Sequence, residues 1–177
     1  MSFFPYQAAV WLGISAYHAG LLATRWFTED VHPLQVVAEC LAGATVSRGI
    51  WVVSEYAVHR YLLHGPLYPI QHKYHHESPV DDKYMFVTPM ITLPANALYY
   101  YGVRLVAGET VTTMLWVFMP LHYLAFEWLH WLSHQPISDQ TSLIYMVKQY
   151  HRDHHKNPHV NYGITSPTGD FLCNTLA

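Results

Sequence analysis

Ten of the fourteen histidines in this sequence fall into four clusters whose spacing is suited to metal binding. On a helix, residues at positions i, i+3 and i+4 lie on one face, so an H-x-x-H-H box or an H-x-x-x-H pair can direct its imidazoles to one place. Neutral imidazole is a good ligand for iron, zinc and copper. The clustered histidines are His59 and His64; His72, His75 and His76; His130 and His134; and His151, His154 and His155.

The number of imidazoles indicates two metal ions. Ten ligands exceed the six that such an ion ordinarily accepts, so two ions sharing the set is the natural count. His59 and His64 are five residues apart and do not share a face on a straight helix, so we expect the helix to end or distort there, near Gly65-Pro66. One box alone would be weak evidence, because a core or surface coincidence gives the same spacing. Four boxes, each at or beyond the end of an apolar segment, favour a metal centre.

Four apolar stretches predict the elements that position the histidines: residues 8–26, 33–58, 84–103 and 110–132. A membrane span needs roughly 20 residues to cross a hydrocarbon core of about 30 Å. The fold class we expect is all-α: an integral-membrane bundle of about four apolar helices in two hairpins, with a cytosolic helical cap that carries the histidine boxes. Pro89 and Pro94 are expected to kink the third helix. A soluble bundle with the same helices buried is the alternative.

The same pattern predicts a single domain over residues 1–177. We divide it into a first hairpin (1–58), the first two boxes (59–84), a second hairpin with the third box (85–134), and the fourth box with the C-terminal segment (135–177). Residues 1–24 carry no charge, and without a positive start they are expected to form a retained helix rather than a signal peptide. Cys40 and Cys173 suggest no disulfide framework.

The charge distribution excludes nucleic acid and suggests an orientation. The net charge is −3, charged residues make up 12 % of the chain, and no basic stripe is present. Most Lys and Arg residues flank the histidine boxes, whereas the two hairpin turns at residues 25–32 and 104–109 hold few. The positive-inside rule therefore places the boxes on the cytoplasmic side of a multi-pass protein, in the endoplasmic reticulum of a eukaryote or the inner membrane of a bacterium.

The order and spacing of the boxes resemble the fatty acid hydroxylase superfamily, the membrane histidine-box di-iron enzymes, over residues 55–175. Further stretches are similar to the fatty acid 2-hydroxylase branch: Glu55-Tyr56, residues 79–84 and 87–89, residues 161–166, Gly169-Asp170-Phe171, and Asn174-Thr175. The resemblance implies that all ten clustered histidines are metal ligands. The short spacing between His64 and His72 is closer to sterol-acting members, and Gly169 and Asn174 replace the usual aromatic residue and glycine.

Two acidic residues are candidates for orienting the ligands. Glu127 lies one turn before His130 in an apolar segment, where an ionisable group is costly and usually functional. The resemblance also places an acid there. Glu55 stands in the same relation to His59, and Asp153 could orient a ligand or face water. The histidines expected not to bind metal are His18, His32, His122 and His159. Residues 99–101, all tyrosine, suggest an interfacial aromatic belt.

These features predict an O2-dependent lipid hydroxylase, acting on the 2-position of a fatty acyl chain of a fatty acid or sphingolipid. The expected cofactors are two metal ions, iron in the working enzyme with zinc possible in a purified sample. The sequence has no haem or flavin motif, so electrons are expected from a separate donor, which the resemblance suggests is cytochrome b5 or ferredoxin-like. The alternatives are a sterol- or carotenoid-acting hydroxylase or desaturase on the same scaffold, and a membrane zinc-binding protein without redox activity.

Overall fold

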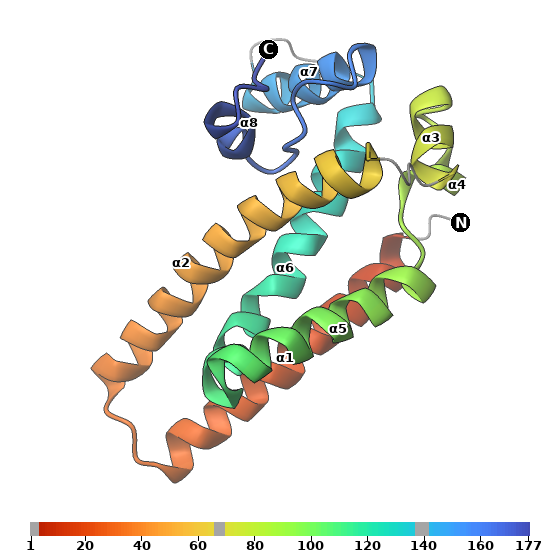
Figure 1. Cartoon of the computed structure of the whole chain (residues 1–177). Coiled ribbons are helices and arrows are strands. Elements are labelled where there is room, and N and C mark those ends of the chain that lie inside the picture. Colours follow the sequence, from red (N-terminus) through yellow and green to blue (C-terminus); the bar gives the residue numbers. More distant parts are fainter. Residues whose placement is uncertain (1–3, 66–69, 137–141) are drawn as a thin grey trace. The chain divides into compact units, whose positions relative to one another are not determined.

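A computed structural model describes residues 4–65, 70–136 and 142–177, and this part of the chain is helical and contains no strand (Figure 1). The all-α prediction is therefore confirmed. The elements, in chain order, are α1 (Phe4–Thr28), α2 (Pro33–Ala57), the π-helical turn η1 (Val58–Leu63), α3 (Ile70–Glu77), α4 (Asp82–Met85), α5 (Pro89–Ala107), α6 (Glu109–His134), α7 (Leu143–Lys156) and α8 (Thr168–Leu172).

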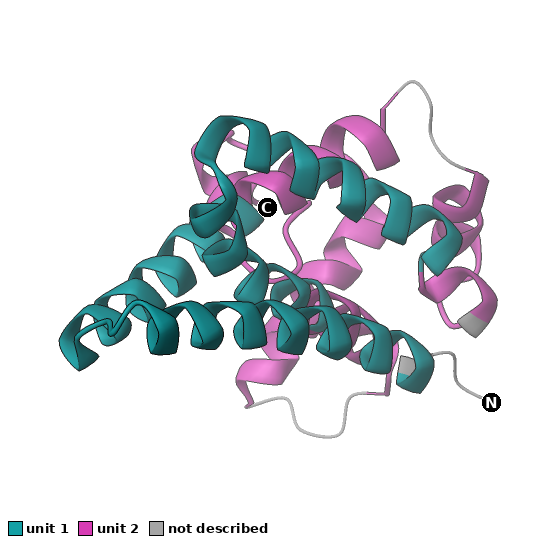
Figure 2. Cartoon of the chain, turned by 90° about the horizontal axis from the view of Figure 1, so that it is seen from below, with its two compact units in different colours: residues 1–51, 87–124 teal, residues 52–86, 125–177 magenta. Residues whose placement is uncertain are grey.

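The chain divides into two compact units (Figure 2). Unit 1 comprises residues 1–51 and 87–124, and unit 2 comprises residues 52–86 and 125–177. Both α2 and α6 pass from one unit into the other. The ten clustered histidines all belong to unit 2, so the candidate site can be described within one unit.

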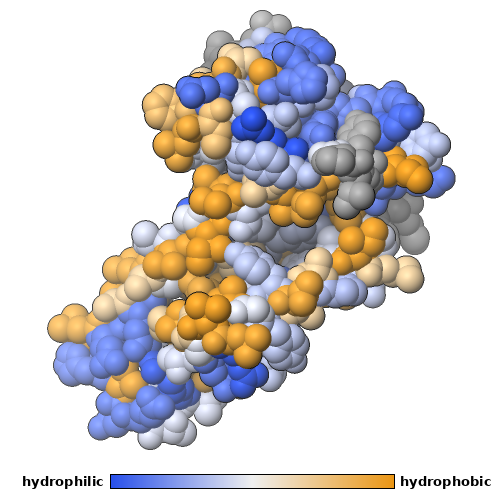
Figure 3. All heavy atoms as spheres, viewed as in Figure 1, coloured by the Kyte–Doolittle hydropathy of each residue, from blue (hydrophilic) through white to orange (hydrophobic). Residues whose placement is uncertain are grey.

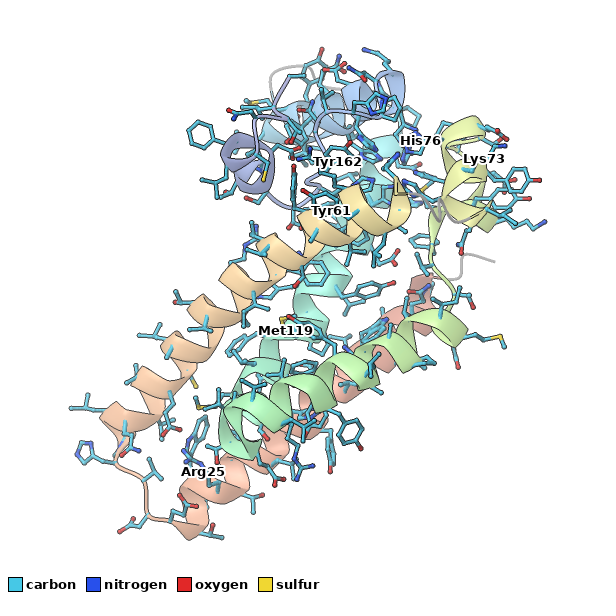
Figure 4. The ribbon with its side chains drawn as sticks, in the orientation of Figure 1. Arg25, Tyr61, Lys73, His76, Met119 and Tyr162 are labelled. Atoms are coloured by element: carbon cyan, nitrogen blue, oxygen red, sulfur yellow. The ribbon has the colours of Figure 1, made fainter. Side chains whose placement is uncertain are left out.

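Unit 1 packs around a small apolar core of Leu115, Trp116 and Met119 from α6. Tyr99 and Tyr100 of α5 pack against this core, with ring centroids 5.5 and 5.1 Å from that of Trp116. Tyr99 and Tyr100 are thus partly buried against the core, and the interfacial belt that they were predicted to form with Tyr101 remains a prediction. Met119 is labelled among the side chains in Figure 4.

The two predicted hairpin turns in unit 1 are present. At the first turn, Arg25 forms an ion pair with Glu39 of α2, and the Trp26 indole N–H donates to the same carboxylate at 2.7 Å. At the second, Gly108 alone separates α5 from α6 and adopts a φ of 79°, which glycine tolerates best. Arg104 and Glu109 form an ion pair of 2.7 Å across it.

The third apolar segment begins later than the sequence predicts. Residues 84 and 85 belong to α4, and α5 starts at Pro89 after a Thr88 N-cap whose hydroxyl accepts from the Met90 N–H. Pro89 was expected to kink the helix but begins it, since the first turn needs no N–H donor at that position. Pro94 does lie inside α5.

One helix of the described residues, α2 continued by η1 (Pro33–Leu63, 31 residues), is long and apolar enough to cross a membrane. Only 11 % of its most apolar window is buried within the protein, which is unlike the core helix of a soluble bundle. Figure 3 shows apolar side chains along the helices of unit 1 and polar ones at the turn between α1 and α2. The membrane bundle of four spans that the sequence predicts remains a prediction.

Candidate metal centre

Directly after α2, unit 2 contains a departure from α-helical geometry at the first histidine box. In η1 the backbone N–H of His64 donates to the carbonyl of His59 at 3.0 Å, a bond five residues back along the chain. A π-helical turn of this kind brings residues i and i+5 to one side, and such turns are frequent at functional sites. The ring centroids of His59 and His64 lie 5.0 Å apart. The expected distortion is thereby confirmed, although Pro66 lies outside the described residues.

The ten histidines gather into two groups of five. In each group, one nitrogen per imidazole lies within 4.8 Å of the corresponding nitrogens of the others. The first cluster is His59, His64, His72, His76 and His154. The second cluster is His75, His130, His134, His151 and His155.

Each H-x-x-H-H box divides its histidines between the two clusters. Helix α3 supplies its i and i+4 members to the first cluster and its i+3 member, His75, to the second. Helix α7 supplies its i+3 member, His154, to the first cluster and its i and i+4 members, His151 and His155, to the second. Figure 4 shows His76 on the side of α3 toward the other histidine-bearing elements and Lys73 on the outer side. The boxes of α3 and α7 therefore link two adjacent sites.

The first cluster has several imidazole nitrogens directed at one point. His64 Nε2 lies 3.0 Å from His154 Nε2 and 2.9 Å from His72 Nε2. One ring nitrogen carries at most one proton, so both contacts cannot be good hydrogen bonds at once. His59 Nε2 is buried and has no hydrogen-bond partner within the described residues. Converging lone pairs repel one another, and a cation between them removes that repulsion, so these residues fit a metal ion.

The second cluster repeats the pattern with different members. His151 Nε2 lies 3.0 Å from the Nε2 atoms of both His134 and His155. His130 Nε2 and His75 Nε2 are 2.8 Å apart. Histidines 75, 130 and 151 are buried, with 1 %, 6 % and 1 % of their surfaces exposed. The second cluster therefore fits a metal ion on the same grounds.

The nitrogen separations suggest a coordination geometry. Two imidazole nitrogens, each about 2.1 Å from a shared ion, lie about 3.0 Å apart when the angle at the ion is 90°, and about 3.4 Å apart at the tetrahedral angle. The observed contacts of 2.8–3.0 Å match the right angle. Five imidazole donors in each cluster also exceed the four ligands of a structural zinc site.

The two clusters lie against each other. The rings of His76 and His155, one from each cluster, stack with centroids 4.2 Å apart and an interplanar angle of 18°. His75 and His76 are neighbours in α3, as are His154 and His155 in α7. The two candidate metal sites are therefore adjacent.

Desolvation keeps these imidazoles in the neutral form that binds metal. Burial lowers the pKa of His64 from its ordinary 6.5 to about 3, with His154 and His76 adding to the effect. Burial likewise lowers the pKa of His76 and of His154 to about 4. The pKa of the fully buried His151 is lowered by burial and then by His130. At neutral pH the rings need lose no proton before they bind a cation.

Two imidazoles of the first cluster are oriented by a loop that follows α7. His154 Nδ1–H donates to the Val160 carbonyl at 2.7 Å, and His59 Nδ1–H donates to the Tyr162 carbonyl. A hydrogen bond of this kind fixes the tautomer and leaves the Nε2 lone pair free to bind a cation. The sequence contained no sign of these acceptors, because they are backbone carbonyls.

Two buried carboxylates hold the loop in place. Asp170 accepts hydrogen bonds from the N–H groups of Tyr162 and Gly163, at 2.8 and 2.7 Å. Glu55 accepts from the next two, those of Ile164 and Thr165, the latter at 2.7 Å. Four consecutive backbone donors are thus bound by two acidic side chains. Glu55, predicted to orient an imidazole, holds this loop; Asp170 was noted within a motif but given no role.

The remaining acidic and histidine candidates from the sequence lie partly in the protein interior and partly at its surface. Glu127 is buried in α6, 1 % exposed, one turn before His130. Asp153 pairs with Lys156 at 2.7 Å at the surface. The histidines outside the two clusters are His18, His32, His122 and His159. Sequence analysis missed Lys148, a buried lysine of α7 that donates to the Pro136 carbonyl at 3.0 Å and so attaches the end of α6 to α7.

Comparison with known proteins assigns the family. The family model for fatty acid hydroxylase matches residues 45–175, so the chain belongs to the fatty acid hydroxylase family. The match includes every member of both histidine clusters. The resemblance inferred from the boxes is confirmed.

Individual relatives include hydroxylases and a monooxygenase. The chain is 27 % identical over 138 residues to fatty acid 2-hydroxylase of Rattus norvegicus, an alignment that covers 72 % of this chain and 37 % of that protein. It is 25 % identical to the dihydroceramide fatty acyl 2-hydroxylase of Arabidopsis thaliana, covering 88 % and 75 %. It is 28 % identical to methylsterol monooxygenase 1 of Danio rerio, covering 85 % and 50 %. The chain thus spans little more than a third of the rat enzyme.

A solved structure shares the fold. The visible hydroxylase domain of full-length Scs7p aligns with a TM-score of 0.82 at 21 % identity, covering 98 % of this chain and 66 % of that one. At this level of identity the likeness supports the fold of the chain and no finer property.

Proposed function

We propose that this chain is a membrane-bound dimetal oxygenase that hydroxylates a C–H bond of a lipid. The observation that carries the proposal is the pair of adjacent five-histidine clusters in a chain of the fatty acid hydroxylase family. Two iron ions held there would supply the oxidation of an unactivated C–H bond by O2, with two electrons from a separate donor. Cytochrome b5 or a ferredoxin-like protein is the donor we expect.

The residues of the chain would hold the two ions and limit the access of water to them. The clustered imidazoles hold and separate the ions, and no carboxylate belongs to either five-membered group. Five of the ten histidines, together with Glu55, Glu127 and Asp170, are buried, so the charged and polar groups are fixed in position and bulk water is largely kept from them. Fixed dipoles around a dry site reduce the reorganisation that a reaction requires. Glu127, one turn before His130, is proposed to help orient that ring.

The membrane arrangement we propose is multi-pass. The α2 helix with η1 leads directly from an apolar, largely unburied span into the first histidine box. Other unit 1 helices also expose large apolar side chains, for example Leu12 and Leu21 of α1 and Leu98 and Leu105 of α5. Surface of this kind is costly in water but favourable in lipid. An acyl chain could then reach the site from the bilayer while its head group stays at the cytoplasmic side.

For the substrate we propose a fatty acyl chain hydroxylated at its 2-position, as a fatty acid or within a sphingolipid. The names of the rat and Arabidopsis relatives support this choice. A sterol substrate is the second candidate, supported by the methylsterol monooxygenase relative and by the short spacing between His64 and His72. A non-redox zinc protein is the outcome expected if the loaded protein consumes no O2.

Product analysis tests the proposal. Membranes containing the wild type or a His154→Ala variant are supplied with iron, a reductant and its donor protein, and lipids are analysed by mass spectrometry. We expect 2-hydroxylated acyl chains with the wild type only, with O2 consumption that depends on iron and reductant. A hydroxylated sterol would favour the second candidate, and the absence of both product and O2 consumption would refute an oxygenase.

Orientation is tested separately by labelling. Single cysteines replace Lys73, beside the second box, and Arg104, at the turn between α5 and α6, in a background without Cys40 and Cys173. An impermeant thiol reagent should reach the two positions from opposite sides of sealed vesicles, with the Lys73 position cytoplasmic. Labelling of both from one side would overturn the two-hairpin topology.

A further inference from the structure

The peptide group between Tyr162 and Gly163 makes two hydrogen bonds that face opposite ways. Its carbonyl accepts the Nδ1–H of His59, and its N–H donates to Asp170 Oδ2 at 2.7 Å. A carboxylate is thus joined to a ligand imidazole through one intervening peptide. Hydrogen bonds in such a chain polarise one another, so an N–H bound to a carboxylate makes its own carbonyl a better acceptor.

The surroundings of Asp170 hold this arrangement rigid. Asp170 is 0 % exposed, and besides the two backbone N–H groups it accepts the hydroxyls of Tyr150 and Thr175, both at 2.7 Å. None of these four bonds goes to an imidazole. A Cβ on Gly163 would lie 2.0 Å from the Ser166 carbonyl oxygen, so only glycine lets the loop turn here.

We propose that Asp170 is a positioning residue that acts on His59 through the Tyr162–Gly163 peptide and makes the first cluster the tighter of the two metal sites. This inference rests on the proposed dimetal function. A carboxylate hydrogen-bonded to a ligand imidazole fixes the ring and raises its basicity, and here the peptide transmits both effects. His59 then presents a more electron-rich Nε2 to the ion.

Apart from His130, which Glu127 is proposed to orient, the second cluster has less outer support. The Nδ1 atoms of His75, His151 and His155 are buried and have no hydrogen-bond partner within the described residues. In the first cluster, by contrast, two rings, His59 and His154, donate to carbonyls of the loop. Three ligands of the second cluster therefore lack the orientation and polarisation that the loop provides, and its ion is expected to leave first.

The rate of metal release measures how tightly each cluster holds its ion, and it does not require the enzyme to turn over. Purified full-length protein loaded with two Fe²⁺ per chain is mixed with excess chelator, and the coloured complex is followed in time. We expect two phases of equal amplitude in the wild type. His59→Ala should abolish the slow phase and His130→Ala the fast one, which assigns the slow phase to the first cluster. Asp170→Asn, which keeps the shape and removes the charge, should accelerate the slow phase by about 10–100-fold and leave the fast phase unchanged.

Tyr150→Phe is the matched control, because it removes one hydrogen bond from the same carboxylate but leaves the Gly163 N–H bond. It should leave the slow phase within a factor of about two, and in Mössbauer spectra only Asp170→Asn should shift one of the two iron signals. Equal acceleration by both variants, or acceleration of both phases, would reduce Asp170 to a structural residue and overturn the proposal. If Asp170→Asn does not fold, the Mössbauer spectrum of apo protein filled with one Fe²⁺ per chain decides which cluster fills first: a signal that changes in His59→Ala supports the proposal, and one that changes in His130→Ala refutes it. If the protein shows the two release phases but forms no lipid product, the proposed function is refuted and the inference about Asp170 is not.

Discussion

Replacing His154 with alanine should remove the ion of the first cluster and abolish hydroxylation while the protein remains folded in the membrane. His154 is 0 % exposed, its Nε2 lies 3.0 Å from that of His64, and its Nδ1–H donates to Val160. The variant therefore removes one of five donors and also releases one end of the loop that supports His59. Loss of an outer partner alone typically weakens metal binding about 10–100-fold.

Loss of a donor should exceed that range. We expect the dissociation constant of the first-cluster ion to rise at least about 100-fold, which corresponds to about 2.8 kcal/mol of binding free energy. Metal analysis of the purified variant should give about one ion per chain in place of two, because the second cluster draws only its i and i+4 histidines from α7. His76→Ala should behave in the same way, and His75→Ala or His155→Ala should lose the second ion.

The control for this series is His159→Ala. His159 lies five residues after His154 but is exposed and outside both clusters. Its replacement should leave metal content and product formation at wild-type levels. If His159→Ala lost metal as fully as His155→Ala, the assignment of ligands would be refuted, and if all four box variants stayed active, the oxygenase proposal would fail.

Three further predictions follow from the structure. Glu127→Gln should lower hydroxylation by about 10–100-fold, less than any ligand variant, because an amide can still accept a hydrogen bond from an imidazole N–H; initial rates measure this. Chelation of both ions should lower the thermal unfolding midpoint, since an ion present at 1,000 times its dissociation constant contributes about 4 kcal/mol of stability; a midpoint that did not change would contradict a folded-state metal site. Gly169→Ala should destabilise unit 2 by about 1–3 kcal/mol, because the new Cβ would lie 2.6 Å from the Tyr56 ring; chemical denaturation at fixed metal tests it.

Two departures from the family pattern have structural consequences. Gly169 stands where the resemblance predicts an aromatic residue, and its backbone packs directly on the ring of Tyr56. Asn174 stands where the resemblance predicts a glycine and adopts a φ of 55°, a left-handed conformation that asparagine tolerates better than most residues. The backbone at Asn174 is therefore accommodated, and the Thr175 side chain still reaches Asp170.

Several properties could be predicted because they depend on local chemistry. The helical class follows from apolar periodicity, and the ten histidines identify themselves by residue type and by spacings that match one face of a helix. The five-residue gap between His59 and His64 is incompatible with a straight α-helix, and η1 resolves it by a π-helical turn. The start of α5 was predicted less well, because the Thr88 N-cap places it at Pro89. The packing of Tyr99 and Tyr100 against the core was not predicted either, because it depends on contacts with α6.

The sequence by itself identified the family, the helical class and the ten candidate ligands, since the spacing of the imidazoles and the order of the boxes are local features of the chain. Only the tertiary structure decided how the histidines divide between two clusters, because helical spacing places His72, His75 and His76 together but does not say which partner each ring meets. It also decided what supports the ligands. His59 and its acceptor Tyr162 are 103 residues apart, and the Tyr162 acceptor is a backbone carbonyl that every residue possesses. No residue type marks such a contact, so folding alone creates it.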